Sequence, residues 1–355
     1  MNNEWSNQNK EFQKLISKKE TFEEGIKCLL KLRASLFEQI TQIVRGFPDD
    51  AFWQLPFPSA EGNHATTLAW SIWHLFRIED ICVHELVLSG KSLQILKSGE
   101  WQKKIGAKII TTGNELNDEQ TVEFSKSLNV QVLYEYAKQV IEATNKVLLD
   151  LDFETCKKTF SETDRVRLVE SKCVSVDDKS VWLIDYWCGK NIAGLLKMPF
   201  SRHWIMHVEA MQRIKNKLCK LARKGVDPIA YCGFSCNHCF LSQWCGSCRT
   251  EYNACSFATC SPDGICPNAK CCKEKGFDGC WQCDEIKTCT KGFYTPDCDG
   301  ANAAKAQALF IGKYGKKEFL KLHDKLHEKF EFAKTQEILG QDLEKAFEFL
   351  ENYIS

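Results

Sequence analysis

Apolar residues recur at three- and four-residue spacing along much of the first 225 residues, which is the period of an amphipathic helix. Thr21 and Glu24 have the spacing of a capping box at the start of the first such segment, and Gly46 and Pro48 close it. The four long segments are 21–47, about 66–90, about 129–151 and about 199–224. Four long amphipathic helices predict a helix bundle.

The connections between these helices, 91–128 and 151–198, are too long for the tight loops of a simple up-down bundle. Within the second, VRLVESKCVSV is compatible with a short hairpin. After Ala301 the apolar positions predict three more helices, whose apolar faces are expected to pack rather than to form a binding groove. These positions are 309–311, then 319, 322 and 326, then 338, 343, 347 and 350. The expected fold class is mainly α.

The charge balance narrows the range of partners. Lysine plus arginine equals aspartate plus glutamate, at 47 each, so the chain lacks the basic excess of a dedicated nucleic-acid or membrane-surface binder. The N-terminus is polar, and no stretch approaches the roughly 18 apolar residues of a spanning helix. We therefore expect a soluble cytoplasmic protein with no nucleic-acid or membrane partner.

The cysteines indicate two domains in the 355 residues. Six of the 20 are scattered before residue 220, and 14 lie between Cys232 and Cys298. The stretch LARKGVDPIAYC has the basic residues, glycine and proline that typically end a helix and begin a linker. The expected organisation is an extension at 1–20, a four-helix bundle at 21–226, a cysteine-rich metal-binding domain at 227–300, and helices at 301–355 that pack with it.

Two histidines lie one turn apart in SRHWIMHVEA, at His203 and His207. Residues four apart on an α-helix share one face, about 6 Å apart along the axis, so both imidazoles can reach one point. His74, in WHLFRIED of the second helix, is the candidate third ligand. Imidazole nitrogens suit zinc, nickel or iron, and three of them leave a coordination position open. Taken alone, an H-x3-H pair is more often two half-exposed side chains.

Neighbouring residues refine this metal hypothesis. His203 lies in the first turn of its helix, where the helix dipole disfavours imidazolium and favours the neutral form that binds a metal. His84 points to another face and is interpreted as a surface or interhelical histidine. Arg77 and Asp80 are most simply a helix-surface ion pair, although Arg77, one turn from His74, is also a candidate substrate-binding residue for an anionic ligand.

The cysteine-rich segment predicts metal binding more strongly, because it contains three C-x2-C pairs. A reducing cytosol disfavours structural disulfides, and so short a segment has few apolar residues for a core, so metal ligation is expected to supply much of its folding energy. Thiolates suit zinc and iron–sulfur clusters alike, and His238 is a candidate replacement for one thiol. The expected ligands are Cys232, Cys236, Cys239, Cys245, Cys248, Cys266, Cys271, Cys280, Cys283 and Cys289.

The spacing C-x3-C-x2-C at Cys232, Cys236 and Cys239 also occurs in radical S-adenosylmethionine enzymes. About 120 residues follow, and they do not show the alternating strands and helices of the barrel that such an enzyme needs. Iron–sulfur ligation without radical chemistry stays open.

Residues of about 20–225 resemble the DinB/YfiT-like superfamily of four-helix metalloproteins, through TTLAWSIWHLFRIED, GEWQKKIG, TTGNELNDEQTVEF and AGLLKMPFSRHWIMH. The resemblance implies a divalent metal, zinc or nickel, held by His74, His203 and His207. It also implies a thiol transferase, in which the metal presents bacillithiol, mycothiol, glutathione or a similar thiol as thiolate to an electrophile, and a homodimer, since related bundles often dimerise. The chain departs from many relatives in reading HVEAMQRI after His207, without a further histidine.

Residues of about 230–350 resemble a bacterial and archaeal cysteine-rich domain of unknown function, through CGFSCNHC, CGSC and KGFDGCWQCDEIKTC. This resemblance implies no activity. Two hypotheses follow for the whole chain. Either the bundle is a metal-dependent thiol transferase with an accessory cysteine-rich domain, or the chain is a non-catalytic metal-binding or redox- and stress-sensing protein that uses the bundle as a scaffold.

Overall fold

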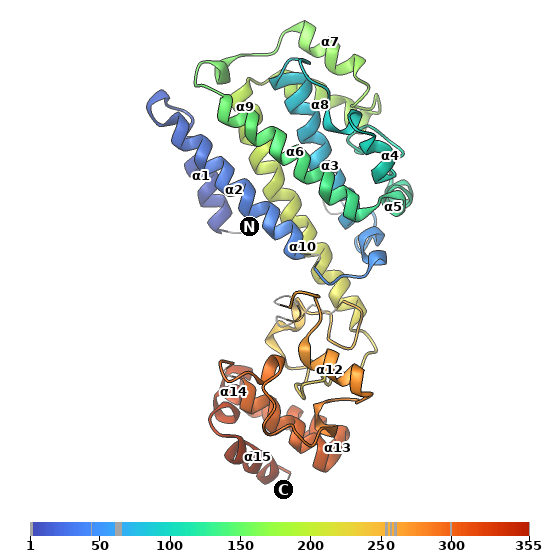
Figure 1. The fold of residues 1–355 in the computed structure, drawn as a ribbon, viewed down its shortest axis with the longest axis vertical. Coiled ribbons are helices and arrows are strands. Elements are labelled where there is room, and N and C mark those ends of the chain that lie inside the picture. Colours follow the sequence, from blue (N-terminus) through green and yellow to red (C-terminus); the bar gives the residue numbers. More distant parts are fainter. Residues whose placement is uncertain are drawn as a thin grey trace. The chain divides into compact units, whose positions relative to one another are not determined.

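The computed structural model of the protein describes residues 3–43, 45–60, 66–252, 255, 258, 261–298 and 300–354. In these residues the regular structure is helical and contains no strand, which confirms the mainly α prediction (Figure 1). The chain divides into two compact units. Unit 1 comprises Met1–Ile43 and Asp49–Ile214, and unit 2 comprises Val44–Pro48 and Lys215–Ser355. None of the helices described is long and apolar enough to cross a membrane.

Unit 1 contains the four long helices that the apolar period predicts. These are α2 (Phe22–Ile43), α3 (Leu68–Ile81), α6 (Val130–Asp150) and α10 (His203–Ala222), whose last turns belong to unit 2. Residues 1–20, expected as an extension, contain helix α1 (Asn3–Leu15), which packs along α2 and buries Phe12 in the core of the unit.

Short helices occupy the two long connections of unit 1. The hairpin suggested for VRLVESKCVSV is wrong, because its first residues belong to helix α7. The helices are α4 (Trp101–Ile105) and α5 (Asp118–Ser127) in the first connection, and α7 (Glu162–Glu170), α8 (Asp178–Cys188) and α9 (Ile192–Lys197) in the second. The second connection therefore adds a helical layer to the bundle.

The capping box predicted at Thr21 is not formed, although polar side chains do fix the start of other helices. The Thr21 hydroxyl donates to the Leu15 carbonyl at 2.7 Å, so it fastens α2 to the end of α1 rather than capping α2. Helix α3 begins with a side-chain cap, since Thr67 accepts from the Trp70 amide at 3.0 Å. Two π-helical turns, Cys82–Val87 after α3 and Met198–Arg202 before α10, alter the helical register on either side of the predicted metal ligands.

A buried ion pair joins all four long helices of unit 1. The Arg33 guanidinium of α2 donates to both carboxylate oxygens of Glu79 on α3, at 2.6 and 2.8 Å, and both side chains are fully buried. Arg33 also donates to Asn145 of α6 and to the Phe200 carbonyl before α10, while the Trp204 indole of α10 donates to Glu79 at 2.9 Å. Nearly every polar group of this hub therefore has a partner, as burial of charge requires.

Unit 2 combines the cysteine-rich segment with a helical tail, each with its own apolar cluster. Helix α12 (Pro267–Lys275) lies within the cysteine-rich part. The tail contains α13 (Ala301–Lys329), α14 (Phe332–Gly340) and α15 (Leu343–Asn352). The first two predicted tail helices are joined in α13 across a kink at Gly315, whose φ is 84°, and the third is divided into α14 and α15.

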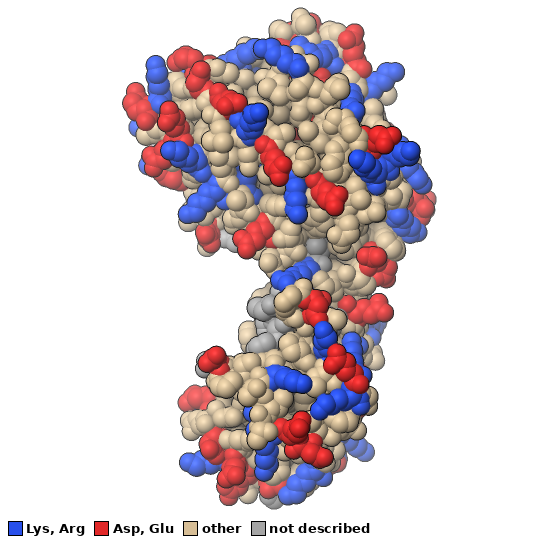
Figure 2. Space-filling view, in the orientation of Figure 1, with Lys and Arg blue, Asp and Glu red and all other residues tan. Residues whose placement is uncertain are grey.

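Figure 2 shows lysine and arginine side chains interspersed with aspartate and glutamate over the face in view. This mixture agrees with the equal numbers of basic and acidic residues in the sequence. The surface in view therefore offers mixed rather than single-sign charge to a partner.

The ion-pair hub predicts a large stability loss when one partner is removed. Glu79→Gln leaves the Arg33 guanidinium buried without a counter-charge, so we expect a loss of about 3–5 kcal/mol in the free energy of unfolding. Urea denaturation of the full chain measures this loss. The control is Glu123→Gln, which removes an exposed pair with Lys126 and should leave the unfolding midpoint unchanged. An equal midpoint for both variants would contradict the role given to the hub.

Candidate metal centre

The three histidines singled out in the sequence converge in unit 1. Their candidate ligand nitrogens all lie within 4.8 Å of one another, and of the side chains described this is the one such group of histidine, cysteine or acidic residues. His74 comes from the middle of α3, and His203 and His207 from the first two turns of α10. They are 4%, 8% and 0% exposed, so the pair on α10 is buried rather than half-exposed.

The distance between His74 and His203 suits a tetrahedral ion. His74 Nε2 and His203 Nε2 are 3.3 Å apart. Two nitrogens bound to zinc at about 2.05 Å with a tetrahedral angle lie about 3.3 Å apart. His203 Nδ1 and both ring nitrogens of His207 are buried without a hydrogen-bond partner, which costs free energy unless another group satisfies them. A metal ion bound by three imidazoles fits this donor set.

Backbone carbonyls of residues 110–113 position the α3 face that carries His74. Four consecutive carbonyls each accept a hydrogen bond from an α3 side chain, so this stretch runs antiparallel to the helix. The bonds join Arg77 to Ile110, Trp73 to Thr111, His74 to Thr112 and Trp70 to Gly113, at 2.7, 3.3, 2.8 and 3.2 Å. We call residues 110–113 the carbonyl strap.

The strap fixes the tautomer of His74. Because a carbonyl only accepts, His74 Nδ1 carries the proton that it shares with Thr112, and the lone pair is left on Nε2, facing His203. The Trp70 ring stacks on the His74 ring at 4.4 Å between centroids, with 11° between the planes. Gly113 has a φ of 81°, and a Cβ atom there would lie 2.8 Å from the Trp70 ring nitrogen. This glycine therefore permits the close approach of Trp70.

Burial keeps all three imidazoles uncharged. Loss of solvation lowers the pKa of His74 to about 4, with the Thr112 carbonyl opposing the shift. The pKa values of His203 and His207 are lowered well below the usual value by burial and by the neighbouring imidazoles. Neutral imidazole is the form that binds a metal, so the site is in its ligating state near neutral pH.

A pocket of about 820 Å³ in unit 1 reaches His74. Trp70 and Trp182 contribute aromatic surface to its wall, and Lys179 and Asp118 contribute opposite charges. A small molecule that enters the pocket therefore meets the His74 edge of the centre together with groups that can bind either charge.

Arg77 and its neighbours form a buried network rather than a surface ion pair. Arg77 and Asp80 are both fully buried, and the guanidinium donates to Asp80, Gln94 and the carbonyl strap. His84, expected at a surface or between helices, is 4% exposed and bonded to Asp80, which raises the histidine pKa against the effect of burial. Arg77 thus holds the strap, and it is not among the residues that line the pocket.

The structure separates the cysteines of unit 2 into two groups around two cavities. Cys232, Cys236, Cys239, Cys245, Cys248, Cys255 and Cys266 line a cavity of about 80 Å³, and we call them the first thiol set. Cys271, Cys272, Cys280, Cys283 and Cys289 line a cavity of about 30 Å³, and they form the second thiol set. Each set includes one cysteine absent from the expected ligands, Cys255 and Cys272.

Burial raises the pKa values of five thiols of the first set, for example to about 12 for Cys248 and to about 11 for Cys236. One thiol in each set has a lowered pKa instead. A hydrogen bond from Cys255 lowers the pKa of Cys266, and one from Cys272 lowers the pKa of Cys280. The thiols whose pKa values burial raises require a metal or another cation to lose their protons at neutral pH.

A second histidine cluster in unit 2 has a different geometry. His238 lies against His327 with parallel rings, 9° apart and 4.3 Å between centroids, and its Nε2 pairs with Asp324 at 2.7 Å. His323, one turn before His327, is 4.7 Å from it between ring centroids. Parallel stacked rings direct their nitrogens along separate planes, so this arrangement does not aim them at one ion. The H-x3-H spacing of His323 and His327 was a sequence signal for this cluster.

Comparison of the chain with models of protein families, with curated proteins and with solved structures gives no match. The likeness to the DinB/YfiT-like superfamily therefore rests on the sequence motifs and is consistent with the geometry of the three histidines.

Gly113→Ala is expected to weaken metal binding, since the new methyl group displaces Trp70 from His74 and disturbs the strap. We expect a loss of about 10-fold in metal affinity. This is the lower end of the roughly 10–100-fold loss that follows when a residue supporting a metal ligand is changed. Competition with a chromophoric chelator measures it. Gly225→Ala is the matched control, because Gly225 has a φ of 82° and nothing within 4 Å of the added atom. Equal affinity in both variants would show that the strap does not support the centre.

The metal-free protein is expected to lose stability on acidification. An imidazole whose folded pKa lies below the ordinary value of about 6.5 takes up its proton first in the unfolded chain, so acid favours unfolding. The free energy of unfolding should fall below pH 6.5 by up to about 1.4 kcal/mol per pH unit for each histidine, and for His74 until pH about 4. Urea midpoints of chelator-treated protein measure this slope. His207→Leu should reduce it, and an unchanged slope would contradict burial of the uncharged ring.

Proposed function

We propose that unit 1 is a metal-dependent thiol transferase of the DinB/YfiT-like kind, with His74, His203 and His207 as metal ligands. The observation that carries the proposal is the convergence of three uncharged imidazoles beside a pocket that reaches one of them. None of the other histidine, cysteine or acidic side chains described joins the group, which leaves a coordination position for a ligand from the pocket.

The neutral ligand set supports thiol activation. A divalent ion held there supplies its full charge to lower the pKa of a bound thiol. The three imidazoles contribute no compensating negative charge, since burial keeps them neutral, and the Thr112 carbonyl holds the His74 ring in its ligating orientation. The reaction class is addition or substitution, in which the thiol gives its proton to solvent and its sulfur forms a bond to an electrophilic carbon. In a substitution the bond from that carbon to the leaving group breaks and the group departs with the electron pair. In an addition the π bond breaks and the neighbouring atom takes up a proton.

The pocket wall suits a small thiol that carries charges of both signs. Lys179 can bind a carboxylate, and Glu119 and Asp118 can bind an ammonium group, although Asp118 also accepts from the Ser59 amide at 2.7 Å. Trp182, which is 48% exposed, offers apolar surface for the electrophile. We therefore propose a small-molecule thiol and an electrophile as the partners of this unit.

For unit 2 we propose that the cysteines bind metal and that this half is an accessory to the bundle. The support is the collection of buried thiols around two cavities in a segment with a small apolar cluster. Metal binding would give this segment much of its folding free energy.

The test compares two equally buried histidines of the same long helical region. His74→Ala should remove about one divalent ion per chain and lower the rate of conjugation of a generic electrophile with glutathione, bacillithiol or mycothiol by more than 100-fold, since loss of even an outer-shell partner costs 10–100-fold. The matched control, His84→Ala, also removes a histidine that is 4% exposed but should keep the metal. Elemental analysis and product formation are the measurements.

Two results would overturn the proposal in different ways. If His74→Ala keeps both metal and activity, the three-histidine centre is not the site. If the metal is lost but the unmodified protein turns over none of the thiols, the chain is a metal-binding or sensing protein in which the bundle serves as a scaffold.

A further inference from the structure

The first thiol set encloses more space than one metal ion needs. A single tetrahedral zinc draws four thiolates to about 2.3 Å from the ion, so that neighbouring sulfurs lie about 3.8 Å apart. The cavity among these seven thiols measures about 80 Å³, several times the roughly 10–15 Å³ at which a cavity holds one water molecule. Its other walls combine apolar residues, among them Ala230, Phe234 and Phe293, with polar ones, which are Tyr231, Ser235, Ser247 and Asn268.

The second thiol set provides an internal comparison. Its cavity is about 30 Å³, and the sulfurs of Cys272 and Cys280 lie 3.6 Å apart, close to the separation in a four-thiolate zinc site. The same fold thus presents one narrow thiol cavity and one wide one. The wide cavity also has more thiols than a single ion can use.

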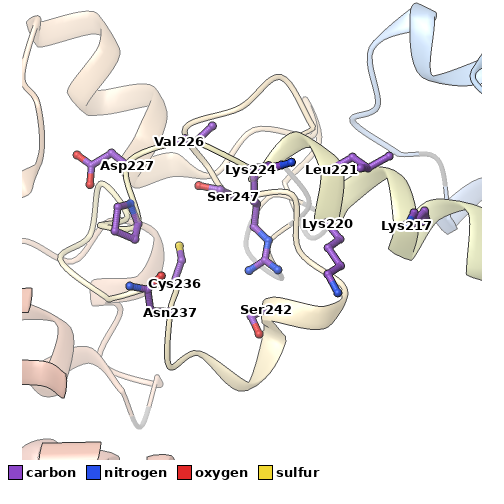
Figure 3. A pocket seen from close by; sticks show the side chains of 12 residues that line it. Lys217, Lys220, Leu221, Lys224, Val226, Asp227, Cys236, Asn237, Ser242 and Ser247 are labelled. Carbon is purple, nitrogen blue, oxygen red and sulfur yellow. The ribbon is translucent and has the colours of Figure 1, made fainter. Parts of the chain in front are cut away.

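Positive charge lies beside the first thiol set. A separate open pocket of about 410 Å³ shares Cys236 with the thiol cavity, and Lys220, Arg223 and Lys224 also line it. Figure 3 shows Cys236 and Asn237 facing this pocket across from Lys220. These cations can offset the negative charge that several thiolates confer on a bound centre.

We propose that the first thiol set holds an iron–sulfur cluster, built from several iron and sulfide ions, whereas the second set holds a single zinc ion. This rests on the proposed metal binding by unit 2 and deepens it by assigning the type of centre to each cavity. Cluster ions fill the wide cavity and use thiolate ligands, including Cys236 and Cys239, each of which loses its proton on binding. Access from the open pocket to Cys236 makes the cluster sensitive to oxygen.

The test uses the full chain, purified without oxygen and treated with sulfide and with equal amounts of ferrous and ferric iron, so that the cluster assembles without a further oxidant. We expect iron and acid-labile sulfide in near-equal amounts, together with a broad visible absorption that fades in air. Cys236→Ser and Cys239→Ser should lose most of the iron and the colour but keep the zinc of the second set. Cys283→Ser should lose about one zinc per chain and keep the colour. Cys298→Ser is the matched control, a half-buried thiol of unit 2 outside both sets, and should keep both metals.

The outcomes separate this inference from the broader proposal. If the unmodified chain contains zinc but no sulfide, the cluster proposal is wrong and metal binding by unit 2 still stands. The same conclusion follows if Cys283→Ser loses the colour and Cys236→Ser keeps it. A chain that binds no metal in unit 2, with all of its thiols open to a thiol reagent, overturns both. If a variant fails to fold, as judged by circular dichroism, the iron, sulfide and zinc contents of the unmodified chain still decide the question.

Discussion

The buried pair of Arg33 and Glu79 is the interaction on which the arrangement of unit 1 depends. Its hydrogen bonds reach α2, α3, α6 and α10, and a charged pair with this many fixed partners tolerates little rotation of any helix. Glu79 lies five residues after His74 on α3, and the indole that binds Glu79 belongs to Trp204, next to His203 on α10. The contacts that hold the bundle together therefore also set the relative rotation of the two helices that carry the three histidines.

The sequence predicted the parts of this structure that follow from local periodicity. The long helices of unit 1 lie where apolar residues repeat at helical spacing, and His203 and His207 share a face because they are four residues apart. His74 was named as the candidate third ligand from its place in the second helix, and the resemblance strengthened that prediction, but no local pattern sets the distance between two helices. The non-helical backbone at Gly315 separates the first two predicted tail helices, as expected, whereas the division of the third into α14 and α15 escaped prediction.

The carbonyl strap and the two thiol sets depend on tertiary structure, so the sequence gives little indication of either. The carbonyl strap is an irregular stretch held by side chains, so it has neither the period of a helix nor that of a strand. Which cysteines line which cavity depends on the path of the loops beside α12. Cys266 lies at the start of this helix and lines the first cavity, while Cys271 and Cys272, farther along the same helix, line the second. Neighbours in sequence thus face different cavities, which spacing rules do not reveal.

Opening of the carbonyl strap would shorten the time for which the three histidines hold an ion. A stretch without its own backbone ladder opens more readily than a helix core, and each opening of residues 110–113 would release the proton-bearing edge of His74 and the support of Trp70 together. The ring would then be free to turn away from its two companions on α10. If the three histidines hold an ion, its retention would therefore depend on how often these four residues open, although none of the four is one of the histidines.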